Sequence, residues 1–132
     1  MTLLQLTYAS RPFGFDAGML AGILSDARRC NARDQITGAL ICREDLYLQL
    51  LEGPAEAVEA AYVRIRRDDR HIEIRPLTRR LVEDRLFGAW AMRDDPAHSW
   101  LWSREAVHDG AAENATEAEV LAIFERLASG NT

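Results

Sequence analysis

Apolar and polar positions alternate at the start of the chain. In residues 3–8 two leucines and Tyr8 fall on one face of an extended segment, and the other face carries a leucine, a glutamine and a threonine. This period of two predicts a half-buried β-strand. Apolar residues then recur every three or four positions, which predicts a helix over about residues 17–31 with Asp16 as its N-cap.

Two further apolar runs, residues 36–42 and 46–51, are separated by about three polar residues. Strand-like runs joined by so short a polar connection predict a β-hairpin. Pro54 follows and suits the first turn of a second amphipathic helix. Beyond that helix we expect a charged strand with one solvated face over residues 72–81 and a last strand over residues 87–92.

The expected order is strand, helix, strand, strand, helix, strand, strand. Helices that interrupt an otherwise antiparallel set of strands are typical of an α+β sandwich of the ferredoxin-like type. Residues 94–132 differ: a short helix is predicted over 104–108, a loop over 109–114, and a helix after Thr116 with a capping glutamate three positions on. We therefore expect one domain over residues 1–93 and a C-terminal helical cap that is not a separate domain.

Composition narrows the functional classes. The chain has 132 residues, is 48% hydrophobic and carries a net charge of −5. An acidic chain lacks the basic footprint that duplex binding leaves, so we expect no nucleic-acid partner. No apolar run reaches the roughly 18 residues of a membrane span, and the N-terminus lacks the features of a signal peptide. Because Cys30 and Cys42 have neither disulfide nor metal-ligand spacing, we expect a cytoplasmic protein.

Two carboxamides stand in apolar surroundings. Asn31 ends the first predicted helix, and Gln49 lies in the middle of an apolar strand. A buried carboxamide without partners costs about 1–3 kcal/mol, so it needs partners within the protein or a ligand with polar edges. The residues alone leave this open, because Asn31 also suits a helix C-cap, Gln49 an edge position, and Tyr8 a core phenol with its hydroxyl at the rim.

Residue spacing does not support the common catalytic arrangements. His71, His98 and His108 are scattered, and no nucleophile–histidine or metal-ligand spacing accompanies them. Two functional classes stay open on the residues alone. One is a small ferredoxin-like hydrolase that uses Asn31 and Arg33 on the acylphosphatase pattern, and the other is an interaction module without a ligand.

Five short motifs occur in a characteristic order. They are Tyr-x-Ser at Tyr8 and Ser10, Asn-x-Arg-x-x-Ile-Thr-Gly from Asn31 to Gly38, Gln-x-Leu-Glu-Gly-Pro from Gln49 to Pro54, Arg-His at Arg70 and His71, and Phe-x-x-Trp-x-Met from Phe87 to Met92. Together they resemble the BLUF family, blue-light sensors that use FAD, over residues 3–93. The remaining residues look like the tail of the short, single-domain members.

The resemblance implies a five-stranded mixed sheet with two helices on one face, and a flavin ring held non-covalently between those helices. Ile23 and Ile65 match the residues that sandwich the ring, Asn31 the residue that hydrogen-bonds its pyrimidine edge, and Arg70 a basic residue near that edge. The implied FAD-binding set is Tyr8, Ser10, Ile23, Asn31, Arg33, Gln49, Ile65, Arg70 and His71.

The resemblance also implies the photochemistry. Tyr8 matches the electron and proton donor, and Gln49 the amide that switches between the tyrosine hydroxyl and flavin N5 and O4. Trp90 and Met92 match residues that compete for the space beside that amide, and Tyr47 stands where the family commonly has phenylalanine. The protein would be a non-enzymatic photoreceptor whose red-shifted state is relayed to an unidentified downstream signalling protein, with a homo-oligomer left open.

Overall fold

The computed structural model describes residues 2–12, 17–43, 45–68, 71–88, 92–96 and 101–129. Four residues named above, Asp16, Arg70, Trp90 and His98, lie outside these ranges. The described elements are β1 (Leu3–Pro12), α1 (Ala17–Asp34), β2 (Thr37–Arg43), β3 (Leu46–Gly53), α2 (Ala55–Arg67), β4 (His71–Val82), β5 (Arg93–Pro96), α3 (Arg104–His108), α4 (Ala111–Asn114) and α5 (Glu117–Ala128).

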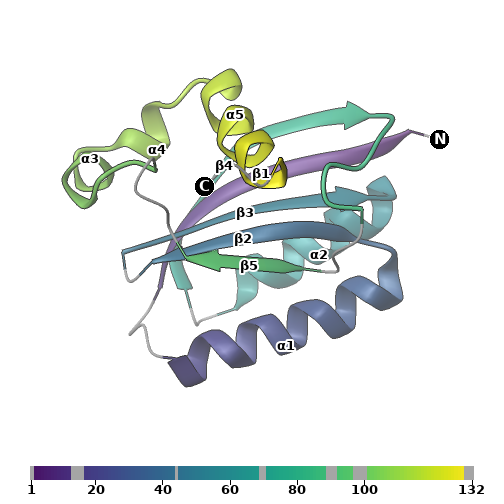
Figure 1. The fold of residues 1–132 in the computed structure, drawn as a ribbon. Coiled ribbons are helices and arrows are strands. Elements are labelled where there is room, and N and C mark those ends of the chain that lie inside the picture. Colours follow the sequence, from purple (N-terminus) through teal and green to yellow (C-terminus); the bar gives the residue numbers. More distant parts are fainter. Residues whose placement is uncertain are drawn as a thin grey trace.

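The strands form one sheet in the order β4-β1-β3-β2-β5 (Figure 1). β1 pairs antiparallel with β3 and β4, and β2 pairs antiparallel with β3. β5 runs parallel to β2 at one edge of the sheet, and β4 forms the other edge. The succession β1-α1-β2-β3-α2-β4 is the ferredoxin-like arrangement, which confirms the predicted α+β class.

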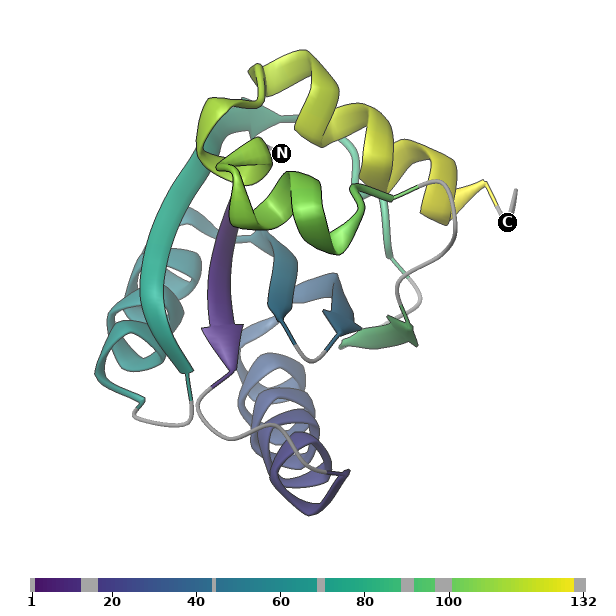
Figure 2. The same cartoon turned by 90° about the vertical axis from the view of Figure 1, so that its left-hand side faces the viewer.

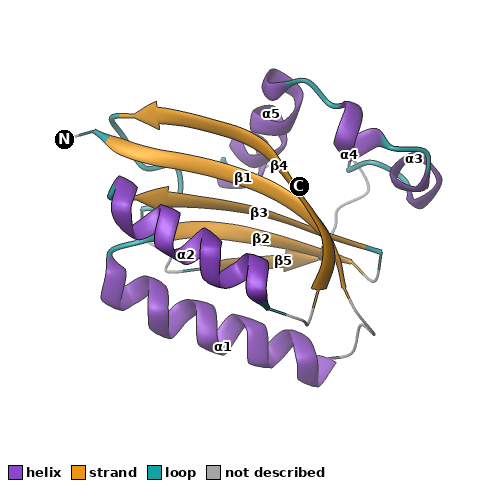
Figure 3. Ribbon diagram, turned by 180° about the vertical axis from the view of Figure 1, so that it is seen from behind, coloured by secondary structure: helices purple, strands orange, loops and turns teal. Residues whose placement is uncertain are grey.

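Helices cover both faces of this sheet. α1 and α2 lie side by side on one face, and α3, α4 and α5 lie on the other (Figure 2 and Figure 3). The core under α1 and α2 includes Leu4, Leu6, Leu24, Ile36, Leu51 and Val58. The core under the C-terminal helices includes Leu48, Leu50, Phe87, Val120, Phe124 and Leu127. The central strand β3 contributes to both cores, so it is buried along its whole length.

β1 is buried on both faces up to residue 10, whereas its alternating pattern predicted a half-buried strand. Polar side chains of β1 bond across to β4. The hydroxyls of Thr7 and Thr78 lie 2.7 Å apart, and Arg80 Nε donates to Gln5 Oε1 at 2.9 Å. Because such cross-strand pairs satisfy polar groups, a face that looks polar in sequence can still be buried.

The last strand lies later in the chain than the predicted residues 87–92. None of the described residues in that range belongs to a strand, and β5 begins one position after Met92. The amide of Phe87 instead donates to the carboxylate of Glu52 at 2.6 Å. The amide of Phe87 is thus bonded to a side chain rather than to a neighbouring strand, and the periodicity of the sequence does not predict this bond.

The helix ends also differ in detail from the prediction. α1 continues to Asp34, beyond its predicted end at Asn31. Gln35 then adopts a left-handed φ of 61°, which ends the helix. In the C-terminal region, the predicted loop over 109–114 contains the short helix α4, whereas the capping box of Thr116 at the start of α5 is present as predicted.

Candidate functional site: a cleft beside Tyr8 and Gln49

Tyr8 and Gln49 occupy directly opposed positions on β1 and β3, and both side chains are buried. The Tyr8 hydroxyl donates a hydrogen bond to Gln49 Oε1, and Gln49 Nε2 donates to Met92 Sδ over 3.4 Å. The amide thus turns its oxygen to the phenol and its nitrogen to a thioether, which is a weak acceptor. The edge position considered for Gln49 is wrong, because β3 is the central strand.

Tyr8 is held as a neutral phenol. Burial raises the pKa of Tyr8 well above its usual value, and the nearby side chains of Tyr62 and Asp68 act in the same direction. Ring centroids of Tyr62 and His71 lie 5.6 Å and 6.2 Å from that of Tyr8. A phenol enclosed in this way can release its proton only along a hydrogen bond that it already makes.

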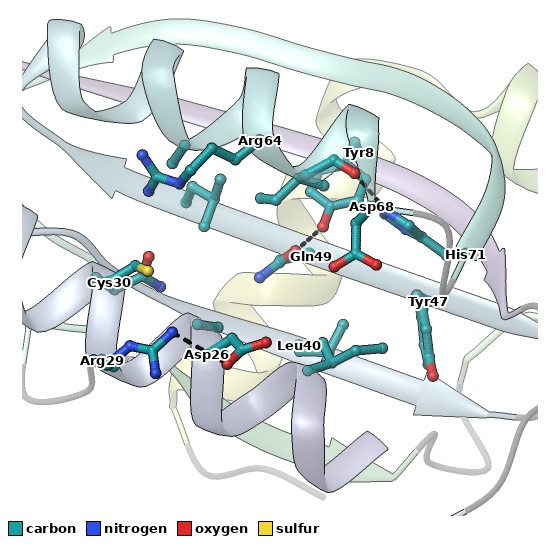
Figure 4. A pocket seen from close by; sticks show the side chains of 16 residues that line it. Tyr8, Asp26, Arg29, Cys30, Leu40, Tyr47, Gln49, Arg64, Asp68 and His71 are labelled. Atoms are coloured by element: carbon teal, nitrogen blue, oxygen red, sulfur yellow. Dashed lines mark hydrogen bonds and ion pairs between the residues drawn. The ribbon is translucent and has the colours of Figure 1, made fainter. Parts of the chain in front are cut away.

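A cleft of about 250 Å³ opens between α1, α2 and the sheet, next to this pair (Figure 4). Its lining includes Tyr8, Gln49 and residues of both helices. The volume is just below the roughly 300–1,000 Å³ of pockets that enclose small ligands. The cleft therefore suits one planar ring system, with the rest of a larger ligand outside.

Most of the surface that lines the cleft is apolar, and polar side chains contribute the rest. Ile23, Ala27 and Asn31 recur every four residues along α1, so all three side chains meet the cleft from one helix face. Ala61 and Ile65 do the same from α2. The branched side chains supply apolar contact and the alanines leave room, while the buried carboxamide of Asn31 adds a donor and an acceptor. This set fits a flat heteroaromatic ring with polar edges, such as a flavin.

His71 lines the cleft and is fixed by two partners. Its Nε2 lies 2.8 Å from the main-chain oxygen of Ile65, which can only accept, so Nε2 carries the proton. Its Nδ1 lies 2.8 Å from Ser10 Oγ, and in the neutral ring it accepts from that hydroxyl. Ser10 is not among the described residues that line the cleft. It acts on the cleft only through the ring that it orients.

Arg33 is also absent from the described lining of the cleft. Its guanidinium bonds both carboxylate oxygens of Asp34, at 2.9 Å and 3.0 Å, and its side chain is 65% exposed. This hydrogen-bonded pairing holds the pKa of Asp34 below its usual range. Asn31 faces the cleft while Arg33 binds Asp34 outside it, so the hydrolase pattern that would combine them has no common site.

Met92 is bound to the site at two points. Gln49 contacts its sulfur, and Arg28 Nε on α1 donates to its main-chain oxygen at 3.1 Å. The residue just before β5 is thus attached to the buried amide and to a sheet-covering helix. Trp90, predicted beside the same amide, lies outside the described residues.

Some lining residues are not identified by the sequence motifs. Asp26 and Arg64 line the cleft and make ion pairs at 3.3 Å, with Arg29 and Asp34 respectively. Asp68, four residues after Arg64, lines the cleft as well. Helical spacing would have found Asp26 and Arg64, because residues three or four positions apart share a helix face.

Across the described ranges, no group of three or more His, Cys, Asp or Glu residues is placed to hold a metal ion. Neither cysteine forms a disulfide. Among the helices of those ranges, none combines the length and the apolar character that crossing a bilayer requires.

The family model described as sensors of blue-light using FAD (BLUF) matches residues 3–93. Photoactivated adenylate cyclase subunit beta of Euglena gracilis is 39% identical over 90 residues, which cover 65% of this chain and 10% of that protein. The corresponding subunit of Euglena longa is 36% identical over 96 residues, covering 69% and 11%. This chain thus spans about a tenth of the length of these relatives.

Solved structures share the fold. The dark-state structure of BlrB, a BLUF protein, superposes with a TM-score of 0.81 at 27% identity and covers 97% of this chain and 96% of that one. The photo-activated state of BlsA superposes with a TM-score of 0.78 over 95% and 93%, and at 24% identity it supports the fold alone. A bacterial light-regulated adenylyl cyclase gives 0.70 at 27% identity, over 97% of this chain and 40% of that one.

Proposed function

This chain belongs to the BLUF family of blue-light sensors that use FAD, and on that premise we propose that it is a photoreceptor that binds FAD non-covalently between α1 and α2. The observation that carries the proposal is the buried hydrogen bond from Tyr8 to Gln49 beside an apolar-walled cleft. Ile23 and Ile65 would hold the two faces of the ring. Asn31 would bond its pyrimidine edge, with Arg70 nearby.

Bound flavin supplies the absorption of blue light and, once excited, the oxidising power. Tyr8 gives up an electron, and its proton leaves along the hydrogen bond to Gln49 Oε1. The raised pKa of Tyr8 keeps the phenol protonated before illumination, so it has a proton to release. The electron and the proton would then return to Tyr8, so that no net chemistry occurs and only the rearranged hydrogen bonds remain. With no product made, the protein would act as a sensor rather than as an enzyme.

Gln49 stores the change. A carboxamide has a donor end and an acceptor end of nearly equal shape, so turning or tautomerising it exchanges the two with little steric cost. The rearranged amide would offer its donor end to the bound ring, and the absorption of the ring would shift to the red. Its contact with Met92 Sδ changes at the same time. Trp90 and Met92 would compete for the space that the amide leaves.

Met92 is the proposed exit for the signal. It directly precedes β5, which we take as the fifth strand of a mixed sheet. Residues 94–132 would act as a cap on a photosensory domain of residues 1–93, and the signal would pass through them to a downstream protein or a second copy. A cytoplasmic location fits this role.

A visible spectrum tests the proposal. The purified protein should be yellow with FAD, and blue light should produce a red shift that reverses in the dark. A colourless protein that takes up no FAD would contradict the proposal and favour the ligand-free module.

A further inference from the structure

Glu52, near the end of β3, is 0% exposed, and the proposed photochemistry does not use it. Its carboxylate accepts three hydrogen bonds. Oε1 accepts from the amide of Leu86 at 2.8 Å, and Oε2 accepts from the amide of Phe87 at 2.6 Å and from the hydroxyl of Thr37 at 3.0 Å. Bonds to an ionised acceptor are roughly twice as strong as neutral ones. This carboxylate therefore holds the main chain of residues 86–87 firmly against β3.

Arg85 completes the cluster. One of its guanidinium nitrogens donates to Thr37 Oγ1 at 2.9 Å and to the main-chain oxygen of Glu52 at 3.1 Å, and the other donates to the main-chain oxygen of Gln35 at 2.8 Å. A buried charge persists in a protein only when it is paired and hydrogen-bonded. The guanidinium of Arg85 supplies that compensation, because the hydroxyl of Thr37 bonds both Arg85 and Glu52. Three consecutive residues, 85–87, are thus hydrogen-bonded to the sheet or to the turn before it.

This cluster lies across β3 from the photoactive pair. Glu52 and Gln49 are three positions apart on one strand, so their side chains point to opposite faces. Gln49 contacts Met92 on the cleft face, and on the other face the ring of Phe87 packs edge-on against Phe124 of α5, with centroids 6.3 Å apart. The chain from Phe87 to Met92 is thus tied to β3 at both ends. The first tie is to a charged acceptor, and the second is a weak amide–thioether contact.

We propose that Glu52 is a positioning residue that fixes the start of this segment, so that a change at Met92 passes forward into β5 rather than back towards β4. The proposal rests on the proposed function, since it needs a rearrangement of Gln49. Phe87 is the firmly held end of this segment, and Met92 is the end whose contact with Gln49 can change. A displacement is therefore expected at Met92. Which end moves depends on the relative strength of the Glu52–Phe87 hydrogen bond and the Gln49–Met92 contact.

Amide hydrogen exchange in the dark tests whether Glu52 holds residues 86–87. Glu52→Gln keeps the shape of the side chain but has one acceptor oxygen in place of two, so an amide nitrogen faces either the amide of Leu86 or that of Phe87. Exchange of the amide that loses its acceptor should accelerate by about ten- to a hundredfold, and exchange of the other amide should accelerate less, because its acceptor remains but is no longer charged. Glu56→Gln, at an exposed glutamate of α2, removes a carboxylate elsewhere and should leave that exchange unchanged. Unchanged exchange in Glu52→Gln would overturn the proposal.

Illumination tests the direction of the relay. In the natural chain, light should change the amide exchange of residues 92–95 and leave that of residues 86–87 unaltered. In Glu52→Gln the red shift should persist, because Tyr8 and Gln49 are intact, while the light-induced change spreads to residues 86–87. A purely structural role would lower protection throughout the sheet and leave the light-minus-dark pattern unchanged. Loss of protection at residues 86–87 in the natural chain under light would also overturn the proposal.

A milder variant keeps the test decisive if Glu52→Gln does not fold. Thr37→Val removes one of the three donors and should give a smaller acceleration at residues 86–87. The dark measurement can be made on flavin-free protein, so it does not depend on the photocycle. If the natural chain shows no red shift, the proposed function and the forward relay both fail, while the dark exchange still shows whether the carboxylate holds Leu86 and Phe87.

Discussion

The amide nitrogen of Gln49 lies 3.4 Å from the sulfur of Met92, while the amide oxygen accepts a hydrogen bond from Tyr8. The phenol faces the acceptor end of the amide and the thioether faces its donor end. Because sulfur is the weaker partner, the bond from Tyr8 is the main restraint on this orientation. A change in the hydrogen bond of the phenol therefore alters the contact at Met92 through the side chain of Gln49 alone.

Replacing Gln49 by leucine should separate flavin binding from switching. Gln49→Leu fills a similar volume but removes both ends of the amide. The apolar walls and Asn31 remain, so FAD should still bind, and the red shift should be lost. Difference spectra before and after blue light measure this, and a full shift in the variant would show that another group carries the switch.

Tyr8→Phe should keep the ring packing and remove the donor. FAD should stay bound and the photocycle should disappear. Tyr62→Phe is the matched control, because its ring lies 5.6 Å from that of Tyr8 and it too loses only a hydroxyl. That control should cycle normally. Equal loss in both variants would contradict a special role for Tyr8.

Alkaline pH should destabilise the fold through Tyr8. Its pKa is raised in the folded protein, mainly by burial, from the ordinary value of 10.0. Below pH 10 the phenol is protonated in folded and unfolded chains alike, whereas above it only the unfolded chain releases the proton. The free energy of unfolding should therefore fall as the pH rises beyond about 10. Denaturant midpoints measured along an alkaline series should fall less steeply in Tyr8→Phe than in the natural chain.

Enlarging a small residue of the cleft should exclude the ring. Ala61 is buried in α2 and lines the cleft, whereas its neighbour Ala60 is exposed. Ala61→Leu should lower the affinity for FAD by at least tenfold, and Ala60→Leu should leave it unchanged. Flavin fluorescence during titration provides the measurement. Equal affinities in the two variants would place the ligand elsewhere.

Truncating Phe124 should destabilise the sheet as well as α5. Its ring is 0% exposed and packs against Phe87, so Phe124→Ala should cost about 3–5 kcal/mol. If residues 94–132 are a cap, unfolding stays a single transition with a lower midpoint. Val63→Ala, at a half-exposed position on α2, should change the midpoint little. Two separate transitions would instead show an independent C-terminal domain.

The sequence predicts those elements whose side chains repeat regularly. The helix carrying Ile23 and Asn31 and the hairpin carrying Gln49 follow from periodicity, and the motif resemblance pairs Gln49 with Tyr8. The strand register then explains the pairing, because the two residues are directly opposed on β1 and β3.

Periodicity does not predict features that depend on a single contact between residues far apart in the sequence. Glu52 follows two leucines and reads as the end of a strand, yet its carboxylate accepts hydrogen bonds from amides more than thirty positions later, and the last strand begins after them. Arg33 belongs to a motif, but a motif does not state which side of a helix a residue occupies. The structure pairs it with Asp34 outside the cleft.

The outer side of β4 limits how copies of this chain can associate. A long strand at the margin of a sheet can recruit a strand from another molecule. Here Pro76 offers no amide proton, and the exposed Arg75, Arg79 and Arg80 would bring like charges together in a strand-to-strand pairing of two copies. Pairing of two copies through β4 is thereby disfavoured. Light-dependent contacts between molecules would instead form through the helices or at the β5 edge of the sheet.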